Sequence, residues 1–356
     1  MTITNSLVPS KNDLWFLPLG GSGEIGMNLN LYGHDGAWLM VDLGITFHDR
    51  LGVEILTPNP EFIAENYKHL AGLVLTHAHE DHVGAVPYLW QALRCPVYAT
   101  GFTATILRQK LKEVPWGSQV PIIEIPLSGQ VTIGPFHVEF ITLTHSIPEP
   151  NALAITTPLG RIVHTGDWKL DEVPLLGASF DSKRLQSLGD EGVLALVCDS
   201  TNVFTPGSSG SEDEVRRNLV ELMASYPNKR LVLACFSSNV ARVQTIIQAG
   251  VAQGRQIALL GRSLQKMVEA AKTNGYLQDI PPFITEEAAM KMPREKVLIL
   301  STGSQGESRS ALARVSALTH PRISLGSDDV VIFSSRIIPG NEKVIGIMQN
   351  RLVARG

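Results

Sequence analysis

The sequence predicts an α/β protein in which two stacked sheets covered by helices are followed by a second domain with a parallel sheet. Two observations carry this prediction. In the first half of the chain, short apolar runs of strand length are separated by Gly or Pro, and helical segments follow some of them. From about residue 209, strand-like and helix-like segments alternate, which is typical of a parallel sheet with helices on both faces.

The first domain is expected to span residues 1–208. Its apolar runs predict strands at 14–19, 29–32, 37–43, 70–75, 97–99, 122–125, 137–142, 152–157, 161–164 and 193–198. The turn at 34–36 suits a hairpin, and the run at 193–198 has the composition of a buried strand. A helix is predicted at 83–93, with Pro87 in its first turns, where the missing N–H is tolerated.

The second domain is expected to span residues 209–356. The segment 205–210 is rich in Gly and Ser and predicts a flexible connector. Ser211 is suited to cap a helix whose first turn carries three acidic residues. Further strands are predicted at 231–236, 256–260, 297–301 and 330–334, and helices at 239–252, 263–273 and 342–352.

The composition argues against several classes of protein, such as disulfide-rich, zinc-finger and membrane-spanning proteins. The 356 residues suffice for two domains, and the net charge of -4 shows no basic surplus. Any RNA binding must therefore use local positive charge or metal ions. The three cysteines, Cys95, Cys198 and Cys235, are too widely spaced for a disulfide framework or a zinc finger. No leader sequence and no apolar run of about 20 residues is found, which predicts a cytoplasmic protein without a membrane partner.

The most informative segment is residues 76–82, which read Thr-His-Ala-His-Glu-Asp-His between an apolar strand and an apolar helix. In an extended loop His77, His79 and Asp81 project to one side, and His82 approaches from the start of the helix. Three imidazoles and a carboxylate are costly to bring together without a cation, and these ligands suit zinc and similar metals. The alternative is a polar loop in which Asp81 caps the helix, but a cap needs none of the histidines.

Two further candidate ligands follow predicted strands. His145 comes after the strand at 137–142, and Asp167 comes after the strand at 161–164. Alone, a histidine at a strand end is more typical of a structural residue, and a Gly-Asp pair is more typical of a turn. The two residues are therefore candidate ligands only because they would complete the cluster at 77–82. The remaining histidines are interpreted as structural: His34, His48, His69, His137, His164 and His320.

Together, these residues resemble the signature of the metallo-β-lactamase superfamily, and Asp42 in Val-Asp-Leu-Gly resembles its first motif. The resemblance implies an αββα sandwich. It leaves the substrate open, because relatives hydrolyse lactams, thioesters, lactones and phosphodiesters.

The second half resembles the β-CASP branch, and in particular bacterial ribonuclease J. Asp199-Ser200-Thr201 resembles a β-CASP motif, and similar stretches lie at 19–28, 235–239, 301–307 and 334–342. The likeness runs from about residue 13 to 356 and implies that the β-CASP domain is inserted into the metallo-β-lactamase domain. Members continue with a His-x-Ser-Gly-His motif, another ligand histidine, closing strands and a small C-terminal domain. This chain ends before them, so the resemblance implies a C-terminally truncated fold, and activity of this piece is an open question.

The resemblance implies a site with two divalent metal ions, zinc in the first instance and manganese as an alternative. His77, His79, His145 and Asp167 would hold one ion, and Asp81, His82 and the bridging Asp167 the other, activating a hydroxide for attack on phosphorus. Asp81, His82 and Asp167 are the catalytic candidates. Asp42 and Asp199 are expected to orient ligands, and backbone phosphates to be contacted by Ser237, Ser238, Arg262 and Ser304.

The function so implied is a metal-dependent ribonuclease with endonuclease and 5′-to-3′ exonuclease activity in RNA processing and decay. Single-stranded RNA with a 5′-monophosphate is the expected substrate, and the full-length protein is expected to form homo-oligomers. A small-molecule metallo-hydrolase acting on thioesters or lactones is one alternative, and a non-catalytic RNA-binding subunit is another. DNA stays open as a substrate, because backbone cleavage says little about the 2′-hydroxyl.

Overall fold

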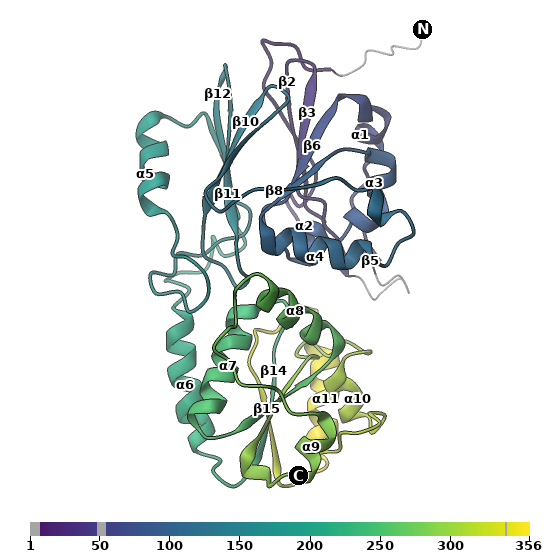
Figure 1. Ribbon diagram of the computed structural model, residues 1–356, viewed down its shortest axis with the longest axis vertical. Helices are drawn as coiled ribbons and strands as arrows, with labels where there is room; N and C mark the ends of the chain where they lie inside the picture. Colours follow the sequence, from purple (N-terminus) through teal and green to yellow (C-terminus); the bar gives the residue numbers. More distant parts are fainter. Residues whose placement is uncertain (1–7, 48–54, 339) are drawn as a thin grey trace. The chain divides into compact units, whose positions relative to one another are not determined.

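The computed structural model describes residues 8–47, 55–338 and 340–356 (Figure 1). The chain divides into two compact units, one formed by Met1–Glu172 and Ala178–Ser209 and the other by Val173–Gly177 and Gly210–Gly356. The expected division was a single boundary after residue 208, whereas here the short segment 173–177 also joins the second unit. His48, interpreted above as structural, and Pro339, which lies in the stretch 334–342, are outside the described residues.

The first unit holds two large sheets and a small ribbon. The six-stranded sheet has the order β1-β2-β3-β6-β7-β8, with bounds β1 (Trp15–Gly20), β2 (Leu29–His34), β3 (Ala37–Val41), β6 (Leu70–Val74), β7 (Val97–Ala99) and β8 (Ile122–Glu124). The five-stranded sheet has the order β13-β12-β11-β10-β9, with bounds β9 (Gln130–Ile133), β10 (Phe136–Thr142), β11 (Asn151–Thr157), β12 (Gly160–His164) and β13 (Ala195–Val197). The ribbon pairs β4 (Thr46–Phe47) with β5 (Ile55–Leu56).

Alternate residues of each sheet face two different cores. Leu39 and Val41 of β3 pack with Phe140 of β10 and Leu153 of β11 between the sheets. The opposite face of the six-stranded sheet packs on α1 (Glu61–Glu65), α3 (Val86–Leu93) and α4 (Gly101–Leu111), and that of the five-stranded sheet packs on α5 (Ser182–Glu191). These layers are helix, sheet, sheet and helix, as Figure 1 shows, and they confirm the predicted αββα sandwich.

The predicted helix at 83–93 is wrong in its continuity. The structure has two helices, α2 (Glu80–Val83) and α3 (Val86–Leu93), with a break at residues 84 and 85. Pro87 lies near the start of α3 and has no N–H to donate to the carbonyl of Val83, so one continuous helix would lose that bond. Asp81 and His82 lie in the single turn of α2.

The predicted strand at 37–43 ends early, because β3 stops at Val41 and Asp42 has φ of 61°. A left-handed residue cannot continue a strand, and Asp is among the few side chains that adopt this conformation readily. The strand predicted as buried at 193–198 is correct as a strand but wrong in burial. β13 is an edge strand, and Leu196 in the strand and Leu194 just before it are 61% and 63% exposed.

The second unit is a parallel sheet with helices on both faces, as predicted. The sheet order is β15-β16-β14-β17, with bounds β14 (Arg230–Ala234), β15 (Gln256–Leu260), β16 (Val297–Ser301) and β17 (Asp329–Phe333). The helices are α6 (Glu212–Ala224), α7 (Val240–Ala252), α8 (Arg262–Thr273), α9 (Glu286–Lys291), α10 (Ala311–Ser316) and α11 (Glu342–Val353). None of the described helices combines the length and apolar character needed to cross a bilayer.

A buried ion pair joins the neighbouring strands β14 and β17. Arg230 of β14 donates from Nε and Nη2 to the two carboxylate oxygens of Asp329 in β17, both at 2.9 Å. Arg294 donates to the same carboxylate at 3.0 Å. The side chains of Arg230 and Asp329 are 2% and 1% exposed, so each charge depends on the other for its compensation.

Candidate metal centre

The candidate ligands lie in loops that follow strands of both sheets. β6 leads to His77 and His79, β10 leads to His145, and β12 leads to Asp167. β10 and β12 both run antiparallel to β11, so their carboxyl ends lie at the same edge of the five-stranded sheet. The loops therefore converge where the two sheets face one another, although residues 77 and 167 are far apart in the sequence.

Two loops are held together at this edge by close backbone packing. Gly166 has φ of 57°, and a Cβ at this position would lie 2.9 Å from the Cβ of Thr76. Only glycine allows the loop that carries Asp167 to approach the histidine loop so closely. On the other side, Lys169 N–H donates to the carbonyl of Thr144 at 2.9 Å, which ties the Asp167 loop to the His145 loop.

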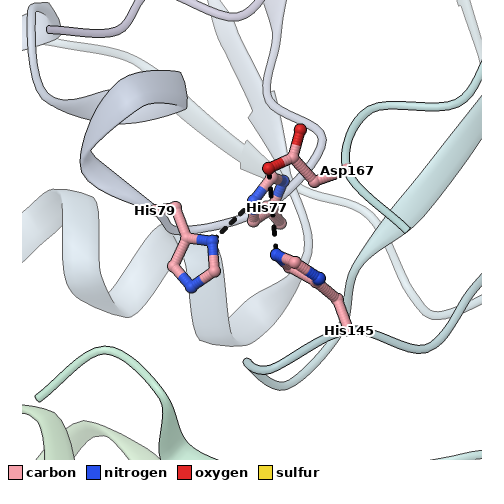
Figure 2. Close-up of side chains that lie close together, drawn as sticks. All are labelled: His77, His79, His145 and Asp167. Carbon is pink, nitrogen blue, oxygen red and sulfur yellow. Dashed lines mark hydrogen bonds and ion pairs between the residues drawn. The ribbon is translucent and has the colours of Figure 1, made fainter. Parts of the chain in front are cut away.

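The first ligand cluster consists of His77, His79, His145 and Asp167, whose donor atoms all lie within 4.8 Å of one another. Figure 2 shows these side chains pointing toward a common centre. His77 Nε2 lies 3.0 Å from His79 Nδ1, and His145 Nε2 lies 3.8 Å from the Asp167 carboxylate. His77 is buried, whereas the other three are partly accessible, so the cluster is open on one side.

The second ligand cluster consists of Asp81, His82 and Asp167, also with donor atoms within 4.8 Å. His82 Nε2 lies 3.5 Å from Asp81 Oδ2 and 3.3 Å from Asp167 Oδ1. Asp167 thus belongs to both clusters: one carboxylate oxygen faces His82, and the other faces His145. This arrangement suits a carboxylate that bridges two cations.

Asp42 is buried, and its carboxylate contacts the histidine loop next to the two clusters. Its carboxylate accepts hydrogen bonds from the backbone N–H and the hydroxyl of Thr76, both at 2.8 Å. It also accepts from His82 Nδ1 at 2.7 Å, which leaves His82 Nε2 directed at the second cluster. Asp42 has a left-handed φ of 61°, and its carboxylate contacts both the histidine loop and His82.

The imidazoles of the first cluster have low pKa values. Burial is the main cause for His77, and neighbouring His82 and His79 also lower its pKa, well below the usual value. Burial lowers the pKa of His79, and it lowers the pKa of His145 to about 3. These side chains are therefore neutral at pH 7, which is the form of imidazole that binds a metal ion.

His82 behaves differently. Burial opposes its positive charge, but the surrounding carboxylates, led by Asp81 and Asp42, outweigh burial and raise its pKa well above the usual value. Burial also opposes ionisation of Asp167, yet the charge and hydrogen bond of His82 lower the pKa of Asp167 well below its usual range. Without a metal, His82 is the group that compensates the carboxylates.

The chemistry of these donors fits divalent metal ions. The donor atoms of His77, His79, His145 and Asp167 lie within 4.8 Å of one another, which is close enough for all four to contact a single cation. Three nitrogen donors and one carboxylate suit zinc, while the mixed nitrogen and oxygen set of the second cluster suits zinc or manganese.

Sequence reasoning missed three polar groups at this site. Asn28 donates from Nδ2 to the Asp81 carbonyl at 2.9 Å and lies 3.3 Å from His82 Nε2. Ser146 Oγ lies 3.3 Å from His79 Nε2, and Thr76 Oγ lies 3.0 Å from His77 Nδ1. Thr76 directly precedes His77, and Ser146 directly follows His145. Their positions in the sequence could therefore have indicated that they lie at the site. Nothing in the sequence connects Asn28 to His82.

The other predicted site residues lie elsewhere. The Asp199 carboxylate accepts from the Thr201 N–H at 2.8 Å, and its own N–H donates to the Thr165 hydroxyl at 3.0 Å. Asp199 thus supports the turn near Asp167 through its backbone. The predicted phosphate contacts all follow carboxyl ends of strands in the second unit: Ser237 and Ser238 after β14, Arg262 after β15, and Ser304 after β16.

Replacing Asp42 by asparagine is expected to weaken metal binding by about 10–100-fold, because outer partners of ligands typically contribute that much. Asparagine tolerates the left-handed backbone, but its amide nitrogen cannot accept the bonds from Thr76 and His82. Chelator competition on the purified protein measures the affinity. The matched control is Asp35→Asn, since Asp35 is exposed and also has positive φ, of 44°. Equal affinities for the two variants would contradict a role of Asp42 in orienting the ligands.

Two known families match successive parts of the chain. Residues 27–227 match the metallo-beta-lactamase superfamily, and residues 228–352 match the family described as ribonuclease J, beta-CASP domain. The chain is 44% identical over 350 residues to Ribonuclease J of Sinorhizobium meliloti, covering 97% of this chain and 62% of that protein. It is 41% identical over 332 residues to Ribonuclease J of Mycolicibacterium smegmatis, covering 92% of this chain and 59% of that protein.

A solved structure extends the likeness of fold to nearly the whole chain. A protein of unknown function from Enterococcus faecalis V583 has a TM-score of 0.61 and 16% sequence identity, covering 95% of this chain and 92% of that chain. The chain spans only 62% and 59% of the lengths of the two curated relatives above. The resemblance predicted from the motifs is confirmed: the chain belongs to the metallo-β-lactamase superfamily, and its second domain is a β-CASP domain of the ribonuclease J type.

Proposed function

We propose that the protein is a metal-dependent ribonuclease that hydrolyses phosphodiester bonds of RNA, both internally and from the 5′ end. The observation that carries this proposal is Asp167, which belongs to two adjoining ligand clusters in a chain whose relatives are named Ribonuclease J. A carboxylate shared by two cations is suited to phosphodiester hydrolysis, in which charge develops on both the attacking and the leaving oxygen.

In this proposal His77, His79 and His145 would hold one metal ion, Asp81 and His82 would hold the other, and Asp167 would contribute to both sites. Bound zinc or manganese ions would polarise the phosphoryl oxygens and lower the pKa of water. Asp81 Oδ2 offers an ionised carboxylate for the proton of the attacking water, since its pKa is lowered by His82 against the opposing effect of burial. Attack on phosphorus expels the 3′ oxygen, so the downstream product carries a 5′-phosphate.

The second unit is proposed to contact the RNA backbone. Ser237, Ser238, Arg262 and Ser304 follow parallel strands, so they share the carboxyl edge of one sheet, where α/β domains bind ligands. Single-stranded RNA with a 5′-monophosphate is the proposed substrate. A cytoplasmic location and homo-oligomeric assembly complete the proposal.

Removal of metal tests the proposal. After treatment with a chelator, the protein is expected to lose cleavage of 5′-monophosphorylated single-stranded RNA, because no cation would then polarise the phosphoryl oxygens or lower the pKa of the attacking water. Addition of zinc or manganese ions is expected to restore cleavage. Product analysis on a gel measures activity, elemental analysis measures metal content, and circular dichroism verifies that the fold survives.

Three outcomes would contradict the proposal in different ways. Cleavage that persists in a verified metal-free protein would exclude a metal-dependent reaction. Hydrolysis of thioesters or lactones without cleavage of RNA would indicate a small-molecule hydrolase. RNA binding without bound metal and without cleavage would indicate a non-catalytic subunit. A parallel assay on single-stranded DNA measures how far the 2′-hydroxyl matters.

A further inference from the structure

The hydroxyl of Thr76 lies between the carboxylate of Asp42 and the ring of His77. Its oxygen is 2.8 Å from Asp42 Oδ2 and 3.0 Å from His77 Nδ1. All three groups are buried, with exposed fractions of 0% for each residue, so water does not compete for these bonds. We propose that Thr76 is a positioning residue, which fixes the proton of His77 on Nδ1 and directs the lone pair of Nε2 at the first ligand cluster. This inference rests on the proposed metal-dependent function.

The direction of each bond follows from counting protons. An ionised carboxylate only accepts hydrogen bonds, so the Thr76 hydroxyl must donate its single proton to Asp42. The hydroxyl then has only lone pairs to offer to His77, so His77 Nδ1 must be the donor. A neutral imidazole carries one proton, which leaves His77 Nε2 without a proton and 3.0 Å from His79 Nδ1.

The Asp42 carboxylate also forms a direct hydrogen bond with a histidine of the second cluster. His82 Nδ1 donates to Asp42 Oδ2 at 2.7 Å, and its Nε2 faces Asp81 and Asp167. Asp42 therefore orients one ligand of each cluster: His82 directly, and His77 through Thr76. The Thr76 hydroxyl supplies the link to His77, because it contacts both Asp42 Oδ2 and His77 Nδ1.

Valine at position 76 separates this role from simple packing. Valine keeps the branched shape that Gly166 approaches, and its backbone N–H still donates to Asp42 Oδ1. Only the hydroxyl is lost. Serine at the same position loses the methyl group but keeps the hydroxyl, so a packing role and a positioning role predict opposite results for Thr76→Val and Thr76→Ser.

The first measurement uses metal-free protein labelled with ¹⁵N-histidine, and long-range ¹H–¹⁵N spectra that report which ring nitrogen carries the proton. His77 is expected to be protonated on Nδ1 in the parent and in Thr76→Ser, and to lose this preference in Thr76→Val. The second measurement is zinc affinity by chelator competition, which is expected to fall by about 10–100-fold in Thr76→Val and to be largely restored in Thr76→Ser. Thr245→Val is the matched control, because Thr245 is buried and its hydroxyl has no hydrogen-bond partner among the described residues.

A parent protein with the His77 proton on Nε2 would overturn the inference, and this holds even if Thr76→Val does not fold. A folded Thr76→Val with an unchanged tautomer and unchanged zinc affinity would overturn it as well. The tautomer is read without metal and without RNA, so it is independent of activity. If Thr76→Val loses the tautomer preference but the parent protein binds no zinc, the positioning role of Thr76 would stand. The proposed metal-dependent function would then be refuted instead.

Discussion

Replacing Asp167 by asparagine is expected to remove RNA cleavage almost completely and to reduce the metal content of the purified protein. Asp167 is the residue shared by both clusters, with one oxygen 3.3 Å from His82 Nε2 and the other 3.8 Å from His145 Nε2. Asparagine offers one oxygen and no charge, so it cannot bridge two cations. Loss of an outer partner already costs about 10–100-fold, so loss of this ligand is expected to reduce cleavage at least about 100-fold.

The design compares Asp167→Asn with Asp190→Asn, which makes the same chemical change at an exposed position of α5. Metal per chain is measured by elemental analysis, and cleavage of 5′-monophosphorylated RNA is measured under identical conditions. The control is expected to match the parent in both readouts. Full metal content together with full activity in Asp167→Asn would remove the bridging carboxylate from the proposal.

Replacing Asp329 by alanine is expected to destabilise the second unit by about 3–5 kcal/mol, the usual cost of breaking a buried ion pair. The change leaves the guanidinium of Arg230 buried without its carboxylate and also removes the partner of Arg294. The adjacent Asp328 pairs with Lys229 at 3.1 Å on the surface, where solvent screens the attraction. Asp328→Ala is therefore the matched control, and its stability is expected to stay close to that of the parent.

Urea unfolding can assign the effect to one unit. All five tryptophans (Trp15, Trp38, Trp90, Trp116 and Trp168) lie in the first unit, so their fluorescence reports its unfolding, while circular dichroism reports both units. Asp329→Ala is expected to move a circular-dichroism transition to lower urea and to leave the fluorescence transition of the first unit in place. An Asp329→Ala protein as stable as Asp328→Ala would show that the buried pair contributes little.

Much of the fold could be predicted from local pattern. The strand at 70–75 and the alternation after residue 209 are confirmed, because apolar runs of strand length report burial on a sheet. The predictions fail where the local hydrophobic pattern conflicts with the place of the segment in the tertiary structure. The apolar run at 83–93 suggested one helix, but the proline breaks it, and β13 has the composition of a buried strand although Leu194 and Leu196 are exposed. α4 (Gly101–Leu111) was not predicted, because its buried residues lie on most sides and leave little periodicity.

By itself, the sequence determined the identities of the donors at His77, His79, Asp81 and His82 and kept them near one another, because residues so close in the chain cannot lie far apart. The tertiary structure decided that Asp167 joins this loop, since the two come from strands of different sheets that meet through Gly166. It also decided which ring nitrogen faces inward, because hydrogen bonds to Asp42 exist only once β3 and β6 lie side by side.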